Sequence, residues 1–222
     1  MSVSFRQAND FLEPLRGKAS TLVVNGRSEN LSLAAFLCSC FSVAHESCTV
    51  FDTDALYASN APLILDGLEK TDTSVFIPRL GRGIRHSILD FLQVTDLSTI
   101  LFDNLNSLLR LFSAEDRNGA NRQFAFTMAI LSHIAKTNGL AVMATAYRQS
   151  KRDKTTIRAP FYELADLTMN VEVKAGQIEF RCTKTSLWQD GHYVWTNPSD
   201  QKRISPARPT GRSAAGQERD TG

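Results

Sequence analysis

A short apolar run that ends in an acid constrains the fold of this chain more than any other stretch. Residues 99–104 read TILFDN, so that four apolar or β-branched residues lead directly into Asp103 and Asn104. An uninterrupted run of this kind is typical of a strand buried on both faces of a parallel sheet. We expect the strand to deliver the Asp103 carboxylate to the carboxyl edge of the sheet, where nucleotide-binding α/β folds hold their ligands.

Strands and helices alternate along the chain on either side of that run. The sequence predicts strands at 21–24, 48–51, 74–77 and 140–147, a polar turn at 25–30, and helices at 31–43, 87–92 and 122–137. Three further strands at 168–173, 178–183 and 193–196 are joined by short turns, which is typical of a meander. The pattern predicts an α/β fold: a three-layer domain with a mostly parallel central sheet and antiparallel strands at its C-terminal edge.

Length and composition favour one domain and a tail. The 222 residues allow one large α/β domain, which we place at 1–197, followed by a polar stretch at 198–222 that we expect to be disordered. No apolar run approaches the length of about 18 residues that a membrane span needs. The net charge of +2 is too small to indicate a nucleic-acid partner by itself. The four cysteines lack CxxC spacing, so we expect structural thiols rather than a metal site.

Several landmarks follow one another in order between residues 11 and 197. Asp52-Thr53-Asp54 follows the second strand, SLLRLF follows the Asp103 strand, Arg122-Gln123 opens the next long helix, and Glu163-Leu-Ala-Asp166 precedes the meander. In this order and spacing the chain resembles the RecA/RadA recombinase superfamily, most closely its small RadB-like and RadA-paralogue members. The resemblance implies a RecA-like fold, a nucleotide site between strand 21–24 and Asp103, and two loops that face single-stranded DNA.

The resemblance fails where the phosphate loop belongs. Such a loop has the form G-x-x-x-x-G-K-[ST], because its glycines let backbone amides close on the phosphates, its lysine neutralises them and its hydroxyl binds magnesium. Here Gly26 takes the first position, but Leu31, Ser32 and Leu33 stand where the second glycine, the lysine and the hydroxyl belong. We therefore expect a degenerate nucleotide site that contains these four residues and binds no cofactor.

Asp54 and Asp103 complete the expected degenerate site. In a working relative they would serve as a base and as a magnesium anchor. The loss of the lysine and the hydroxyl, however, removes most of the electrostatic stabilisation that phosphoryl transfer requires. We favour structural parts for both, with Asp103 as a cap of the following helix and Asp54, like Asp52, as a turn residue. We expect no catalytic residue, and an ATPase with an unorthodox loop is the alternative.

Basic residues gather after the strand at 140–147. Five of them surround a single acid, Asp153: Arg148, Lys151, Arg152, Lys154 and Arg158. The resemblance implies that this segment is one DNA-facing loop and that residues 113–121, with Arg117, form the other. Basic side chains on such loops can follow a phosphate backbone with little preference for base. We expect these residues to contact single-stranded DNA, and a solvated loop without a ligand is the alternative.

These features favour a recombinase paralogue that does not hydrolyse ATP. It would be an accessory in homologous-recombination DNA repair, in contact with single-stranded DNA and with a RecA/RadA-family recombinase or paralogue subunit. The alternative is a RecA-like pseudo-ATPase that serves as a scaffold or regulatory subunit of an oligomeric complex without touching DNA. We expect no membrane contact, and a location in the cytoplasm of a prokaryote or the nucleus of a eukaryote.

Overall fold

The computed structural model describes residues 2–4, 11–61, 64, 73–78, 83–93, 99–148, 164–174, 177–185 and 192–196. Two sequence expectations lie outside the described residues. They are the disordered tail at 198–222 and four of the basic residues expected to meet DNA, Lys151, Arg152, Lys154 and Arg158.

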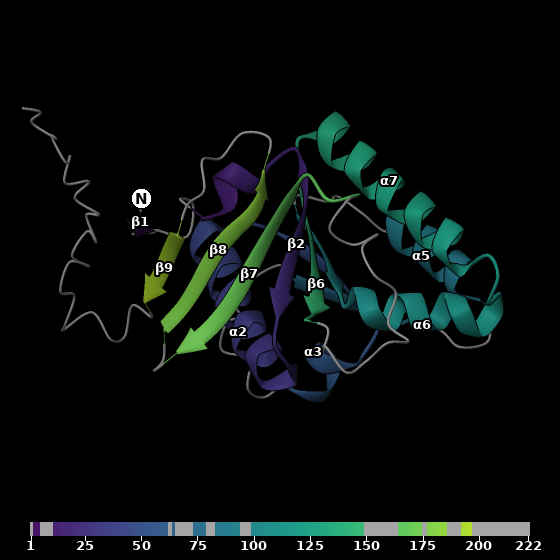
Figure 1. Ribbon diagram of the computed structural model, residues 1–222, viewed down its shortest axis with the longest axis horizontal. Coiled ribbons are helices and arrows are strands. Elements are labelled where there is room, and N and C mark those ends of the chain that lie inside the picture. The colour runs from purple at the N-terminus through teal and green to yellow at the C-terminus, as the bar shows by residue number, and fades with distance from the viewer. Residues whose placement is uncertain are drawn as a thin grey trace, which may run out of the picture.

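The described strands form one nine-stranded sheet in the order β1-β9-β8-β7-β2-β6-β5-β3-β4 (Figure 1). Their bounds are β1 Ser2–Ser4, β2 Lys18–Val24, β3 Cys48–Asp52, β4 Thr73–Phe76, β5 Thr99–Asp103, β6 Ala141–Tyr147, β7 Leu167–Lys174, β8 Gln177–Thr185 and β9 His192–Thr196. The six neighbours from β7 to β4 run parallel, and β8 runs antiparallel to β7 and β9. The expected α/β fold, mostly parallel with a C-terminal antiparallel meander, is confirmed.

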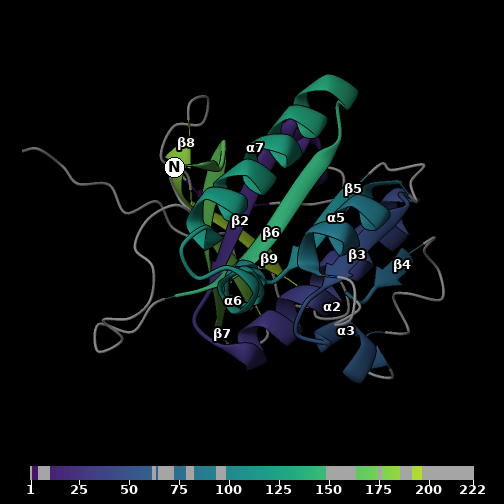
Figure 2. The same cartoon turned by 90° about the vertical axis from the view of Figure 1, so that its right-hand side faces the viewer.

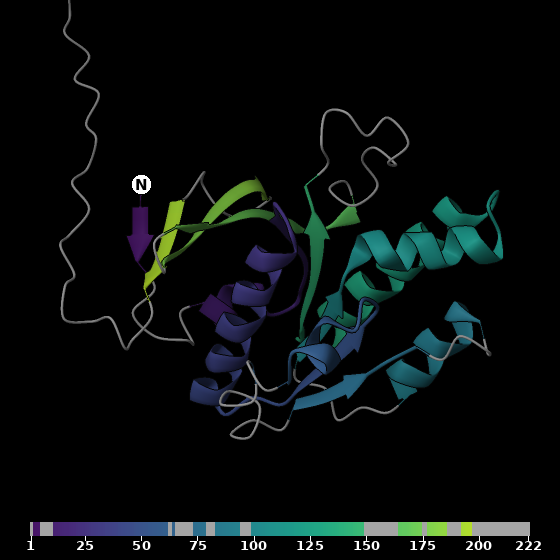
Figure 3. The same ribbon diagram turned by 90° about the horizontal axis from the view of Figure 1, so that it is seen from below.

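Helices cover both faces of this sheet (Figures 1 and 3). Their bounds are η1 Glu13–Leu15, α2 Arg27–Ala44, α3 Leu56–Ser59, α5 Ile84–Gln93, α6 Leu105–Glu115 and α7 Ala120–Asn138. Figure 2 looks onto the layer of α5, α6 and α7, which lies in front of the sheet. The other face packs against α2, so the domain has three layers.

The central strand β5 is the strand predicted from the TILFD run, with all five residues buried. It lies between β6 and β3. Because successive side chains of a strand point to opposite faces, Leu101 joins the core beneath α2, whereas Ile100 and Phe102 join the core beneath α5, α6 and α7. Burial on both faces explains why the run contains no strongly polar residue before Asp103.

The second core is built largely from phenylalanine rings. Phe51 of β3 stacks on Phe102 of β5 and Phe76 of β4, with ring centroids 5.0 and 5.6 Å away. Phe91 of α5 meets Phe51 edge-on at 5.1 Å. Offset and edge-to-face pairs of this kind are worth about 0.5–1.5 kcal/mol beyond area burial, so they hold α5 firmly against the sheet.

The helix after β2 begins earlier than expected, and the expected polar turn at 25–30 is wrong. Helix α2 starts at Arg27, with Gly26 as its N-cap. The Glu29 carboxylate accepts hydrogen bonds from the backbone N–H of Asn25, at 2.7 Å, and from its side-chain amide, at 3.1 Å. An acid in the first turn that holds the chain just before the helix stabilises the helix start. Polar composition at 25–30 therefore marks a capped helix terminus.

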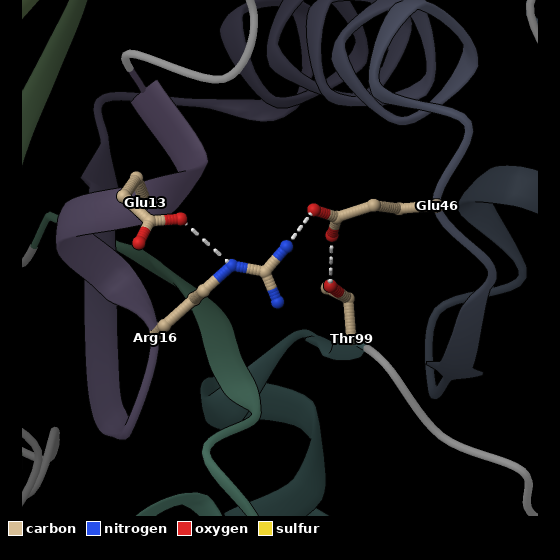
Figure 4. Close-up of polar contacts among 4 residues, drawn as sticks. All are labelled: Glu13, Arg16, Glu46 and Thr99. Atoms are coloured by element: carbon tan, nitrogen blue, oxygen red, sulfur yellow. Dashed lines mark hydrogen bonds and ion pairs between the residues drawn. The ribbon is translucent and has the colours of Figure 1, made fainter.

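Two other features of the fold have no signal in the sequence. Strand β1 is three residues long and pairs in parallel with β9 at the outer edge of the sheet. The second feature lies at the amino ends of the parallel strands, where Arg16 bonds to Glu13 and Glu46 (Figure 4). Glu46 also accepts a hydrogen bond from the Thr99 hydroxyl at 3.1 Å. This cluster ties η1 to the starts of β3 and β5.

Candidate functional site

The candidate site lies where the central parallel strands end. The register pairs Asp52 of β3 with Asp103 of β5, and Val24 of β2 with Tyr147 of β6. Parallel strands in register place their carboxyl ends at one edge, which is where open α/β sheets bind ligands. The structure therefore confirms that β5 places Asp103 at this edge of the sheet.

Asp103 lies at the centre of a buried polar cluster. Its Oδ1 accepts a hydrogen bond from the Asn30 side-chain amide of α2 at 2.7 Å, and another from the Thr145 hydroxyl of β6. All three side chains are buried, with exposed fractions of 1% or less. Its Oδ2 is buried and has no hydrogen-bond partner among the described residues. Among the described residues, therefore, only one of the two carboxylate oxygens of Asp103 accepts hydrogen bonds.

Burial raises the pKa of the Asp103 carboxyl from 3.8 to about 6. The hydrogen bonds from Thr145 and Asn30 lower this pKa, and the negative charges of Asp52 and Asp54 raise it again. Desolvation dominates because an ionised carboxylate loses its water on burial, and the two hydrogen bonds offset only part of that cost. The site therefore carries a carboxyl group that holds its proton to a higher pH than an exposed aspartate does.

The neighbouring acids have structural partners. Asp52 accepts hydrogen bonds from the backbone N–H groups of Leu56, at 2.8 Å, and Ala58, at 3.0 Å, and so holds the start of α3. Asp54 accepts a hydrogen bond from the Asn104 side-chain amide. Both acids therefore order the segment after β3, in keeping with the turn role expected for them.

The expected role of Asp103 as a helix cap is wrong. Helix α6 is capped by Asn104, whose Oδ1 accepts a hydrogen bond from the backbone N–H of Ser107 at 2.9 Å. The peptide bond between Asp103 and Asn104 is cis. The Asn104 backbone N–H donates to the Thr53 hydroxyl at 2.7 Å. Asn104 thus takes the capping role, which leaves the Asp103 carboxylate directed to Asn30 and Thr145.

The nucleotide-site residues predicted from the sequence are not arranged as a loop. Only Asn25 and Gly26 separate β2 from α2, so Leu31, Ser32 and Leu33 lie in the second turn of the helix. Leu33 is fully buried in the core, and the Ser32 hydroxyl donates to the Ser28 carbonyl at 3.2 Å. The assignment of these three residues to the end of a phosphate loop is therefore wrong.

The residues that start α2 are not among those predicted for the site from the sequence. Gly26-Arg27-Ser28 stands at the N-terminus of the helix, in the order glycine, base and hydroxyl with which a phosphate loop ends. The loop that would precede these residues is missing. Gly26 has an extended backbone, and a Cβ at this position would meet no atom within 4 Å. Two residues cannot wrap a triphosphate, so this turn does not fit the nucleotide that the fold would otherwise imply. Arg27 can be identified only once the start of α2 is known, and hydrophobic periodicity does not give that start.

Asn30 and Tyr147 fill the space next to Asp103. The Asn30 amide lies 2.7 Å from Asp103 Oδ1 and 3.5 Å from the Tyr147 hydroxyl. An amide nitrogen is a donor and cannot ligate a cation. Magnesium prefers carboxylate, phosphate and water oxygens in a near-octahedral set, whereas here one carboxylate oxygen is taken by two donors. No cluster of three or more His, Cys, Asp or Glu side chains suited to a metal occurs among the described residues.

Two residues expected to meet DNA are described, and they lie apart. Arg148 is exposed directly after β6, where its backbone N–H donates to the Val24 carbonyl at 2.7 Å. Arg117 is exposed in the turn between α6 and α7. Helix α6 starts at the end of β5 and is 11 residues long, about 16 Å, so this turn lies well beyond the strand ends (Figures 1 and 3).

The strand order and the placement of Asp103 define the class of fold: this is a RecA-like domain. Solved structures agree. A crystal structure of the RadB recombinase superposes with a TM-score of 0.58 at 12% identity, over 82% of this chain and 91% of that chain. A second solved structure, of an ATPase domain, gives a TM-score of 0.57 at 9% identity, over 81% of each chain. The expected resemblance to the RecA/RadA superfamily is confirmed at the level of fold.

Sequence comparison adds nothing to this structural likeness. No protein-family model and no curated protein matches the chain. Within the described residues, no helix combines the length and apolar character that crossing a bilayer requires.

Proposed function

We propose that this protein is a RecA-like paralogue that does not hydrolyse ATP and acts as an accessory in homologous-recombination DNA repair. In this role it binds single-stranded DNA, an active RecA/RadA-type recombinase, or both. The likeness in fold to the RadB recombinase supports a part in recombination.

One observation carries the proposal: β2 runs into α2 through only Asn25 and Gly26. Phosphoryl transfer depends on donors and cations placed around the γ-phosphate before reaction. A two-residue turn supplies no ring of backbone amides, and the Asn30 amide occupies Oδ1 of Asp103. These contacts support a protein that has the RecA-like fold but does not hydrolyse ATP.

The charge at the carboxyl edge supports a contact with nucleic acid. Arg148 is exposed at the end of β6, and the chain continues into Lys151, Arg152, Lys154 and Arg158. An exposed arginine at the strand ends, followed in the sequence by four more cations, supports binding of a polyanion such as a nucleic-acid backbone.

A salt series with a matched charge control tests the DNA contact. We expect labelled single-stranded DNA to bind the wild-type chain with an affinity that falls steeply with salt. Replacing Lys151, Arg152 and Lys154 with alanine should weaken binding and flatten the salt slope by about three, close to one per lost phosphate contact. The control triple Arg85→Ala, Arg110→Ala and Arg122→Ala removes the same charge from α5, α6 and α7 and should leave the slope unchanged. Wild-type protein that binds no DNA, alone or with a recombinase, contradicts the DNA half of the proposal.

A second candidate function is a RecA-like scaffold or regulatory subunit without DNA contact. The specific observation in its favour is that Leu89 and Phe126 leave 53% and 67% of their surfaces exposed on neighbouring helices. Apolar side chains exposed together are typical of protein interfaces. Sedimentation of the chain in an oligomer that shows no salt-dependent DNA affinity would favour this second function.

A further inference from the structure

The outer helices enclose an apolar groove that the proposed DNA contact does not use. A cavity of about 420 Å³ opens between α5, α6 and α7. Six apolar side chains line it: Ile88, Leu89, Leu92, Phe112, Phe126 and Ile130. The groove lies on the helical layer seen in Figure 2, away from the strand ends at which Asp103 is buried.

The exposed rims of the groove are apolar stripes. Phe126 and Ile130 follow one another at a spacing of four along α7, and Leu89 and Leu92 at a spacing of three along α5. Residues so spaced share one face of a helix. Single exposed apolar residues are ordinary, but Leu89 and Phe126, exposed by 53% and 67%, line the same cavity. A continuous apolar surface of this kind marks a binding site.

Charge at the groove indicates the chemistry of its partner. Arg85 of α5 and Arg122 of α7 line the cavity, both are exposed, and no acid lies among the described residues that line it. Guanidinium groups beside an apolar floor favour carboxylates at the edge of an apolar ligand surface.

A second copy of the chain fits this groove poorly. A two-fold symmetric contact places the same patch of each subunit against the other. It would bring Arg85 and Arg122 of both copies together, with no acid among the described lining residues to compensate them. Like charges facing one another across an interface cost free energy.

We propose that this groove binds an acidic amphipathic helix of a partner protein. The helix would lay apolar residues at i, i+3 or i+4, and i+7 between Leu89 and Phe126, which is how amphipathic helices fill helix-lined grooves. Its acidic residues would pair with Arg85 and Arg122. The groove lies apart from the strand ends that hold Asp103, so this inference stands whether or not the protein binds DNA.

A selection experiment supplies the probe. The full-length protein is used to select binders from a phage library of random peptides about 16 residues long, enough for roughly four helical turns. An enriched peptide is then labelled and titrated by fluorescence anisotropy. We expect enriched peptides to share the apolar helical spacing and to carry Asp or Glu beside it. Phe126→Ala should weaken binding about tenfold or more, as loss of a central aromatic contact does.

Charge reversal makes the test specific. Arg122→Glu should abolish binding of the acidic peptide, and replacing the peptide's acids with lysine should restore binding to this variant. Val43→Ala, at a residue 65% exposed on α2, and Arg110→Glu on α6 are the matched controls and should bind as wild type. Because all four positions are exposed, circular dichroism should show the native fold in each variant.

Three results would overturn the inference. The first is a set of enriched peptides that are basic or lack the helical spacing. The second is binding that Phe126→Ala and Arg122→Glu leave unchanged. The third is a homodimer in sedimentation that Phe126→Ala dissociates, which would make a second copy the occupant.

Discussion

Asn30 of α2 and Asp103 of β5 are 73 positions apart in sequence and share a buried hydrogen bond of 2.7 Å. The bond joins the first turns of the helix after β2 to the end of the central strand. A neutral side chain of the protein itself therefore fills the space beside the Asp103 carboxylate.

Asn30→Ala should destabilise the protein. It leaves the Asp103 carboxylate with Thr145 as its remaining donor, and a buried charged group that loses a hydrogen bond costs about 1–3 kcal/mol. Urea unfolding at pH 7 measures the change in the free energy of unfolding. The matched control is Ser39→Ala, at an exposed position of the same helix, which should change it by less than about 0.5 kcal/mol. Equal effects of the two substitutions would mean that the buried bond contributes nothing.

The pKa of Asp103 predicts how stability depends on pH. Its value of about 6 in the folded protein lies above the ordinary value of 3.8, so the folded state binds the proton more tightly than the unfolded state. The stabilisation from this group is therefore fully present below pH 3.8 and is lost as pH rises through about 6. The whole change is at most about 3 kcal/mol.

Asp103→Asn isolates that contribution, because the amide does not titrate in this range. We expect the free energy of unfolding of the variant, relative to wild type, to rise by up to about 3 kcal/mol between about pH 4 and pH 7. Parallel unfolding curves across that range measure the difference. A difference that is constant with pH, or that moves in the opposite direction, would show that Asp103 titrates as an ordinary aspartate.

Two glycines should respond oppositely to substitution. Gly26 has an extended backbone, and a Cβ there would meet no atom within 4 Å, whereas Gly139 ends α7 at φ +67°. Gly26→Ser should be neutral or stabilise by about 0.5 kcal/mol, since serine is a better N-cap. Gly139→Ala should cost about 1 kcal/mol, because the left-handed backbone is strained for alanine. Thermal unfolding compares them, and a large loss at Gly26 would mean that its backbone is closely approached after all.

The sequence predicts the central strand well and the start of α2 poorly, for physical reasons. Residues 99–103 are buried on both faces, so hydrophobicity alone identifies them. Residues 27–30 are all polar, and their helix depends on the contacts of Glu29 with Asn25. Periodicity cannot detect a helix start that is fixed by capping rather than by burial.

In the candidate site, too, one residue can be predicted from the sequence and another cannot. Asp103 is marked by its place at the end of an apolar strand, whereas Asn30 looks like an ordinary polar residue near a helix start. Its burial against Asp103 depends on the packing of α2 over β5, which sequence neighbours do not specify. Counting positions after Gly26 therefore predicts Leu31, Ser32 and Leu33 at the end of the loop, whereas the structure places Arg27 and Ser28 at the start of the helix.

The claim that the phosphate-binding loop has been lost is tested most directly by thermal unfolding with and without millimolar MgATP. A ligand that binds only the folded state must raise its stability, by about 2.7 kcal/mol at one hundred times its Kd. We expect an unchanged Tm. A raised Tm that Arg27→Ala abolishes would instead place a triphosphate at the start of α2, and would contradict the proposal that this RecA-like domain no longer uses ATP.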